Sequence, residues 1–173
     1  MAQTVVVVTF YSRQGGTERL ATAAAVGAVQ ARAGIRMRRL AETDLSATLE
    51  RYPDARESLT RMHREYVVPR EADVIAADAL IVGLPHGMTP ASAECVDYFG
   101  MLARLGAEGR LAGKAAAAVG NGPTRDLIDR ALSAAGLTVL GPHEGSAGGT
   151  TEDAVALGRR IVAAAGSSSR AST

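Results

Sequence analysis

The residues best suited to chemistry in this chain lie in three short loops rich in glycine and small polar side chains. The first loop, residues 11–17, reads Tyr-Ser-Arg-Gln-Gly-Gly-Thr. Glycines let a ligand approach the backbone, and a helix beginning after the loop would add partial positive charge. The residues suited to hold a phosphate monoester are Ser12, Gln14, Gly15, Gly16 and Thr17. The alternative is an ordinary Ser/Thr-rich helix cap. The spacing matches neither the common dinucleotide motif nor the nucleoside-triphosphate motif.

The second and third loops each follow a run of apolar residues. In the second, residues 83–90, prolines and glycines imply a fixed, exposed backbone that could present amide groups to a flat heterocycle. In the third, residues 120–125, Asn121 and Gly122 could donate to a ring carbonyl. Arg125 could stabilise negative charge on a ligand, or it could be a solvated surface side chain. A turn without any ligand remains the alternative for both loops.

Histidines follow two of the apolar runs. His86, in the second loop, is the candidate for a catalytic role, because it could hydrogen-bond to a ligand or offer a flat surface for stacking. His143 could approach the same rim, whereas His63 lies in a charged helical stretch and is expected to be solvated. For His86 and His143, an unremarkable surface position is the alternative. No pair of histidines or acids has a convincing ligand spacing, so we expect no metal site.

The elements that must position these loops alternate along the chain. Apolar runs predict strands at 5–10, 35–40, 79–83, 115–119 and 137–140. Amphipathic stretches predict helices at 18–33, 70–77, 91–105, 125–135 and from 150 or 151 to about 165. The alanine-rich run 115–119 favours a helix by propensity, but its five residues and its place in the alternation favour a strand. The pattern predicts a three-layer, doubly wound α/β fold with a five-stranded parallel sheet. Ligands of such folds bind beyond the carboxyl ends of the strands.

The remaining segments complete the expected organisation of the chain. Residues 1–165 are expected to form a single domain, followed by a mobile tail at 166–173. The charged segment 41–68 reads as weakly helical and broken by Pro53, and its purpose stays open. Cys95 is expected to be a small core residue. Arg36, Arg38 and Arg39 read as a solvated strand face or an oligomer contact.

Composition limits the function classes. The 173 residues have a formal net charge of +1, which gives no electrostatic case for nucleic acid or an anionic membrane as a partner. A single cysteine excludes an internal disulfide. The apolar runs are far shorter than the roughly 20 residues that span a bilayer. Residues 1–10 read as a first strand and not as a signal peptide, so the cytoplasm is the expected compartment.

The three loops in this order resemble those of the flavodoxin-like superfamily. Residues 10–18 resemble its phosphate loop, residues 72–85 the segment before its isoalloxazine loop, and residues 111–114 the stretch before its fourth strand. The pattern covers most of residues 4–165. It is most similar to the NAD(P)H:quinone oxidoreductases of the tryptophan-repressor-binding-protein type. That subgroup carries an aromatic residue in the second loop, where this chain reads His86-Gly87-Met88-Thr89-Pro90.

This resemblance implies a non-covalently bound FMN. The first loop would hold the phosphate. The isoalloxazine ring would be lined by Pro85, His86, Gly87, Met88 and Thr89. The other side of the ring would be closed by Asn121, Gly122 and Thr124. Hydride would pass from NAD(P)H to the flavin and then to a quinone or similar small acceptor, in an enzyme that is often a homo-oligomer. Two alternatives stay open: an electron carrier, which is usually more acidic, and a domain that has lost FMN and acts as a binding or assembly module.

Overall fold

Five parallel strands form the centre of the molecule and confirm the predicted fold class. The structure, a computed structural model, describes residues 3–142 and 149–171. The strands are β1 (Val5–Phe10), β2 (Gly34–Arg39), β3 (Ala79–Gly83), β4 (Ala115–Val119) and β5 (Thr138–Val139). Their order in the sheet is β2-β1-β3-β4-β5, and every pairing is parallel. β3 and β4 are buried along their whole length, as expected for strands covered on both faces.

The direction of winding reverses at the middle of the sheet. From β1 the chain moves outward to β2 on one side, and from β3 it continues through β4 to β5 on the other. Loops leaving β1 and β3 therefore turn to opposite faces, which opens a crevice between them at the carboxyl edge. The first and second loops of the sequence lie at this reversal.

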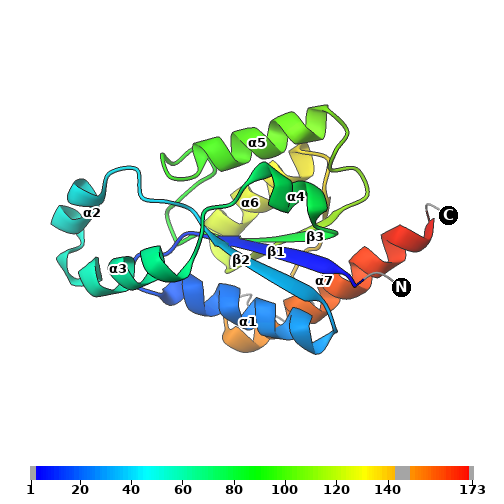
Figure 1. The fold of residues 1–173 in the computed structure, drawn as a ribbon, viewed down its shortest axis with the longest axis horizontal. Coiled ribbons are helices and arrows are strands. Elements are labelled where there is room, and N and C mark those ends of the chain that lie inside the picture. Colours follow the sequence, from blue (N-terminus) through cyan, green and yellow to red (C-terminus); the bar gives the residue numbers. More distant parts are fainter. Residues whose placement is uncertain (1–2, 143–148, 172–173) are drawn as a thin grey trace.

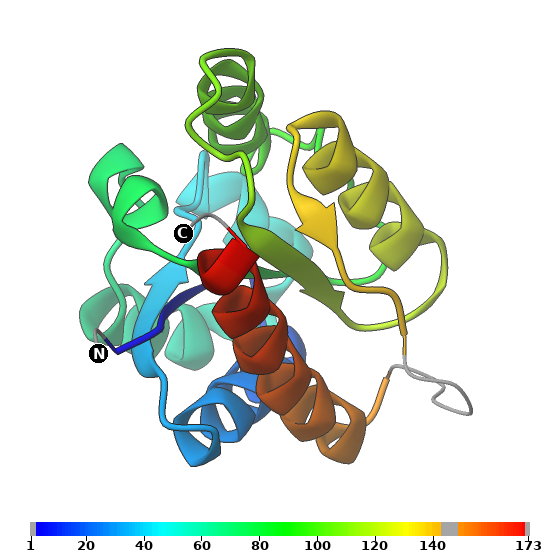
Figure 2. The same cartoon turned by 90° about the vertical axis from the view of Figure 1, so that its right-hand side faces the viewer.

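Helices cover both faces of the sheet (Figures 1 and 2). α1 (Gly16–Gln30) and α7 (Thr151–Ala171) pack on the face that contains Val6 and Val8. α4 (Glu71–Ala76), α5 (Val96–Ala107) and α6 (Gly122–Ala134) pack on the face that contains Val7 and Leu80. The elements thus form the three expected layers. Within the described residues, no helix is both long and apolar enough to cross a membrane.

Small residues let α1 and α7 approach each other closely. A Cβ at Gly27 of α1 would lie 2.0 Å from the carbonyl oxygen of Val155, and one at Gly158 of α7 would lie 2.0 Å from the carbonyl oxygen of Ala24. Backbone is therefore packed against backbone at both positions. The frequent alanines of this sequence serve the same close packing.

Segment 41–68 folds into short helices beyond the carboxyl edge of the sheet (Figure 1). It contains α2 (Leu45–Arg51), a 3₁₀ turn η1 (Pro53–Ala55) and α3 (Arg56–Glu65). Asp44 starts α2 by accepting a hydrogen bond from the amide of Ala47 at 3.0 Å. Leu59 and Met62 of α3 are buried in the same core cluster as α1. The segment is thus packed onto the domain beside the loop that follows β1.

Helix boundaries differ from the sequence expectation at several places, and α6 begins at Gly122 rather than at residue 125. α1 ends at Gln30 rather than at residue 33, because Arg32 adopts a left-handed conformation (φ 67°) before Gly34 starts β2. α5 begins at Val96 rather than at residue 91, because Ser92 Oγ accepts from the amide of Thr89 and holds a turn. α7 continues to Ala171, so residues 166–171 of the expected tail are helical.

The arginines of β2 are divided between the two faces of the sheet, so the expected solvated face holds for the exposed Arg36 and is wrong for Arg39. Successive strand residues point to opposite sides, so Arg38 and Arg39 separate. Arg38 forms two hydrogen bonds with the carboxylate of Asp73, at 2.8 and 2.6 Å. Arg39 is only 4% exposed. The expected burial of Cys95 and the expected exposure of His63 are both confirmed.

Candidate functional site

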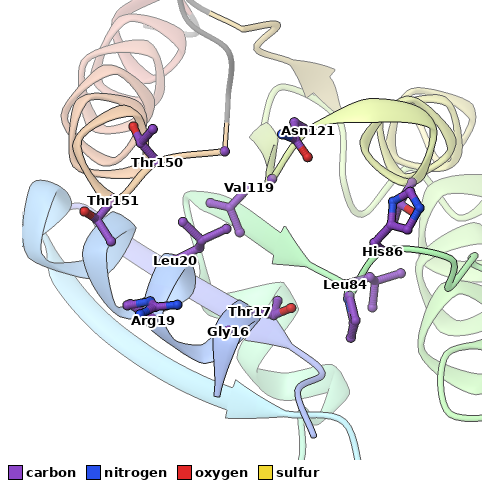
Figure 3. A pocket seen from close by; sticks show the side chains of 14 residues that line it. Gly16, Thr17, Arg19, Leu20, Leu84, His86, Val119, Asn121, Thr150 and Thr151 are labelled. Atoms are coloured by element: carbon purple, nitrogen blue, oxygen red, sulfur yellow. The ribbon is translucent and has the colours of Figure 1, made fainter. Parts of the chain in front are cut away.

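A cavity of about 630 Å³ opens where the loops after β1, β3 and β4 meet (Figure 3). Its walls are the first turn of α1, the end of β3, the end of β4 and the beginning of α7. Its volume lies in the range of small-molecule sites. The lining residues are Gly16, Thr17, Arg19, Leu20, Leu84, Pro85, His86, Val119, Gly120, Asn121, Thr124, Gly149, Thr150 and Thr151. No carboxylate lines it among the described residues.

A second cavity of about 310 Å³ adjoins the first. The two share Gly16, Thr17, Pro85 and His86, so one ligand could extend across both. The residues lining only the second cavity are Ser12, Arg13, Gln14 and Tyr52. Tyr52 comes from segment 41–68 and is the one tyrosine, phenylalanine or tryptophan in either lining among the described residues.

The first loop presents an uncapped helix end to these cavities. Gly15 precedes α1 in a left-handed conformation (φ 90°), and no side chain caps the helix. The backbone hydrogen bonds of α1 begin with the one from the Arg19 amide to the Gly15 carbonyl at 3.0 Å. Ser12 Oγ accepts instead from the amide of Gly15 at 3.1 Å, which shapes the loop. The first-turn amides are therefore left for an external acceptor.

A buried ion pair between Arg39 and Glu42 supports this loop on its protein-facing side. Arg39 donates from Nη2 to the carbonyl oxygen of Ser12 at 3.0 Å and to Glu42 at 2.6 Å. Tyr11 OH donates to the other carboxylate oxygen of Glu42 at 2.6 Å. Burial, followed by this contact with Glu42, raises the pKa of the Tyr11 hydroxyl. The path of the loop is thus fixed by β2 and by the start of segment 41–68.

A second ion pair holds α3 against α1. Arg61 donates to both carboxylate oxygens of Glu18, at 2.9 and 2.6 Å, and Tyr66 OH donates to one of them at 2.7 Å. Arg61 is the largest cause that lowers the pKa of Glu18, and partial burial opposes it. Tyr66 also packs edge-on against Phe10, with ring centroids 5.0 Å apart.

Arg13 lies within the first loop between two tyrosine rings. Its guanidinium carbon is 5.1 Å from the centroid of Tyr11 and 4.7 Å from that of Tyr52. Both distances are within the range of a cation–π contact. Its buried Nε atom has no hydrogen-bond partner in the described part of the chain. Arg13 therefore brings a positive charge to the second cavity and ties Tyr52 to the loop.

The second and third loops meet through a hydrogen bond. The amide of Gly87 (φ 84°) donates to Thr124 Oγ1 at 3.1 Å. His86 is exposed and lines both cavities, and Asn121 also lines the first cavity (Figure 3). A Cβ at Gly87 or Gly120 would meet nothing within 4 Å, so open space lies beside the backbone at both glycines.

Other expected residues lie away from the cavities. The Met88 side chain is 5% exposed and packs in the core cluster that contains Leu84. Thr89 hydrogen-bonds within its own turn, through its amide to Ser92 and through Oγ1 from Ala91. Gly15, Gly87 and Gly122 do not line either cavity among the described residues, although the first two shape the loops. His143 falls outside the described residues.

Arg125 matches neither of its two expected roles. It is 6% exposed, which is inconsistent with a solvated surface side chain, and it lines neither cavity. Its Nη1 donates to the carbonyl oxygen of Gly120 at 3.3 Å, and its Nε lies 3.6 Å from a carboxylate oxygen of Asp129. Arg125 therefore supports the third loop from inside the protein.

Sequence reasoning missed part of the lining. Arg19 and Leu20 face the first cavity one helical turn beyond the phosphate loop. Thr150 and Thr151 were expected only to start the last helix, and they also line the cavity. The only signal for them was their position at a helix start. Tyr52 gave no signal, because its arrival at the site depends on the fold of segment 41–68.

Comparison with known sequences gives a relative at 33% identity. No family model matches the chain. An NAD(P)H dehydrogenase (quinone) from Archaeoglobus fulgidus is 33% identical over 115 residues, which are 65% of this chain and 58% of that protein. The match thus spans less than two thirds of the relative's length.

Solved structures resemble the chain over almost its full length. A flavodoxin from the domain Archaea has a TM-score of 0.62 at 16% identity, covering 94% of this chain and 99% of its own. A WrbA-like flavodoxin from Agrobacterium tumefaciens has a TM-score of 0.61 at 18% identity, covering 95% and 99%. The strand order, the crevice at the β1/β3 reversal and these two matches agree, and they show that the protein has the flavodoxin-like fold.

Proposed function

We propose that the protein binds FMN non-covalently in the two joined cavities and passes hydride from NAD(P)H to a quinone or similar small acceptor. The observation that carries the proposal is the uncapped N-terminus of α1, which opens onto a cavity of about 630 Å³ at the winding reversal. The name of the Archaeoglobus relative supports the reaction, and the flavodoxin-like fold supports the cofactor.

The first loop fits a phosphate monoester. First-turn amides and the Thr17 hydroxyl are donors, and the helix end adds partial positive charge. A Cβ at Gly16 would meet nothing within 4 Å, so a ligand atom has room there. Arg13 would add a full positive charge from the neighbouring position. These donors match the oxygens of a phosphate dianion.

The ends of β3 and β4 fit a flat ring system. Leu84 and Val119 give apolar surface, while His86 and Asn121 give polar groups to the same cavity (Figure 3). The second loop lacks an aromatic side chain. Tyr52 of segment 41–68 supplies one on the side of the second cavity.

When bound, FMN would supply the two-electron chemistry, and the protein would supply binding and orientation. The Gly87–Thr124 hydrogen bond fixes the two loops that would enclose the ring. His86 is exposed on both cavities, where its imidazole could donate to or accept from a ligand. We propose His86 as a hydrogen-bonding residue of the acceptor site.

Steady-state kinetics with the purified protein tests the reaction. We expect NAD(P)H oxidation to depend on both FMN and a quinone, and His86→Ala to lower kcat/KM for the quinone by a larger factor than it weakens FMN binding. His63→Ala is the matched control, because His63 is exposed on α3 outside both cavities. FMN binding without NAD(P)H oxidation would contradict the enzymatic part and leave an electron carrier. No FMN binding would leave a flavin-free module.

A further inference from the structure

An acidic residue lies where the proposed function needs an anion to bind. Glu18 occupies the first turn of α1, and its side chain is largely buried at the phosphate loop. A Cβ built on Gly15 would be 3.5 Å from Glu18 Oε2, so the carboxylate lies directly against the loop. An uncompensated carboxylate there would repel a phosphate dianion.

Segment 41–68 neutralises this carboxylate. Arg61 approaches Glu18 with both terminal nitrogens, at 2.9 and 2.6 Å, and forms a two-pronged ion pair. Tyr66 OH adds a hydrogen bond at 2.7 Å. Both carboxylate oxygens are thus occupied by donors from α3 and the residue that follows it.

The other arginines near the loop are held by other groups, although the charge of Arg39 also lowers the pKa of Glu18. Arg39 is already paired with Glu42 at 2.6 Å and holds the Ser12 carbonyl. Arg13 is held between the rings of Tyr11 and Tyr52, and it forms no ion pair with the described residues. Removing Arg61 would therefore leave the Glu18 carboxylate without its ion-pair partner beside the phosphate loop.

We propose that Arg61 is a positioning residue for phosphate recognition: by pairing with Glu18 it keeps the N-terminus of α1 able to bind an anion. This inference rests on the proposed FMN site. It gives segment 41–68 a function, because α3 carries the compensating charge. Two carboxylates share Arg61, and the second, Glu65, is half exposed and can turn to solvent.

Comparing FMN with riboflavin separates this electrostatic role from a merely structural one. The two flavins differ by the phosphate, which carries about −1.5 to −2 charges at neutral pH. If Arg61 only docks α3, Arg61→Met should weaken both flavins equally. If Arg61 masks Glu18, the same variant should weaken FMN about ten- to thirtyfold while riboflavin affinity changes little. Flavin fluorescence quenching measures both dissociation constants on the full-length protein.

Two further variants complete the experiment. Glu18→Gln in the Arg61→Met background removes the unbalanced charge and should restore most of the FMN affinity. Arg104→Met is the matched control, because Arg104 also pairs with two carboxylates, Glu71 and Glu108, away from the site. Its FMN-to-riboflavin affinity ratio should equal that of the wild type.

The outcomes are distinguishable. Wild-type binding of FMN with an unchanged FMN-to-riboflavin ratio in Arg61→Met overturns this inference alone. Absence of FMN binding by the wild type overturns the proposed function as well. If Arg61→Met does not fold, Glu18→Gln alone decides: removing the acid should keep or tighten FMN binding, and a selective loss of FMN affinity overturns the inference.

Discussion

At the scale of single residues, Gly16 is the point at which a ligand can approach the start of α1 most closely. Gly16 is the first residue of α1, is exposed, and has open space where a Cβ would lie. Unlike Gly15, it has no positive φ, so any residue can occupy the position without backbone strain. A substitution at Gly16 can therefore block a ligand without disturbing the fold.

Gly16→Asp should separate ligand binding from stability. A carboxylate in the first turn interacts favourably with the helix dipole, so the free energy of unfolding should stay the same or rise by up to about 1 kcal/mol. FMN affinity should fall strongly, because the new carboxylate meets the phosphate. Urea denaturation and FMN titration measure the two quantities. Unchanged FMN affinity in a folded variant would place the phosphate elsewhere.

At the scale of elements, the contact between α1 and α7 sets the packing of one face of the sheet. Both helices contribute a glycine at which backbone meets backbone. A methyl group added there has no space, because the close neighbour is a carbonyl oxygen of the opposite helix and not a flexible side chain. The beginning of α7 lines the first cavity, so this contact also positions part of the site.

Gly158→Ala should lower the free energy of unfolding by about 1–3 kcal/mol, the usual cost of overpacking. Gly100→Ala is the control, since Gly100 lies in α5 with nothing within 4 Å of an added Cβ. That variant should gain up to about 1 kcal/mol, because alanine favours a helix more than glycine does. Thermal or urea denaturation measures both, and equal effects of the two substitutions would contradict the close helix contact.

Sequence patterns were informative for elements that are defined by local chemistry. The alanine run 115–119 illustrates this: its propensity favours a helix, yet its position between a helix and a glycine-rich loop correctly predicted β4. Tyr52, Arg61 and Arg39 show the limit. Their contacts with the first loop and with the first turn of α1 join residues 27 to 43 positions apart in sequence, and no local pattern encodes such pairings.

At the scale of the whole molecule, ion pairs connect parts of the fold that are distant in sequence. Asp73 of α4 binds Arg38 of β2, and Glu18 of α1 binds Arg61 of α3. Each arginine is the largest cause that lowers the pKa of its carboxylate partner. Asp129 behaves in the opposite sense, because burial raises its pKa despite Arg125 nearby.

Stability should consequently fall at acidic pH. A carboxylate whose pKa is lower in the folded than in the unfolded chain stabilises the fold above its unfolded pKa of about 4, and this contribution is lost as the pH falls through the folded value. Glu18 and Asp73 should therefore produce a loss below about pH 4, partly offset by Asp129. Glu18→Gln should flatten the decline measured by urea denaturation from pH 7 to 3, and an unchanged pH profile would contradict the role given to the Glu18–Arg61 pair.

FMN binding at the uncapped end of α1 and in the joined cavities can be measured on the purified, flavin-free protein. The protein is titrated with FMN while the quenching of flavin fluorescence is followed. We expect saturable binding of one FMN per chain with a sub-micromolar dissociation constant, and weaker binding of riboflavin. No quenching at tens of micromolar FMN would contradict it. The open glycines and first-turn amides at the carboxyl edge of the sheet would then serve another ligand.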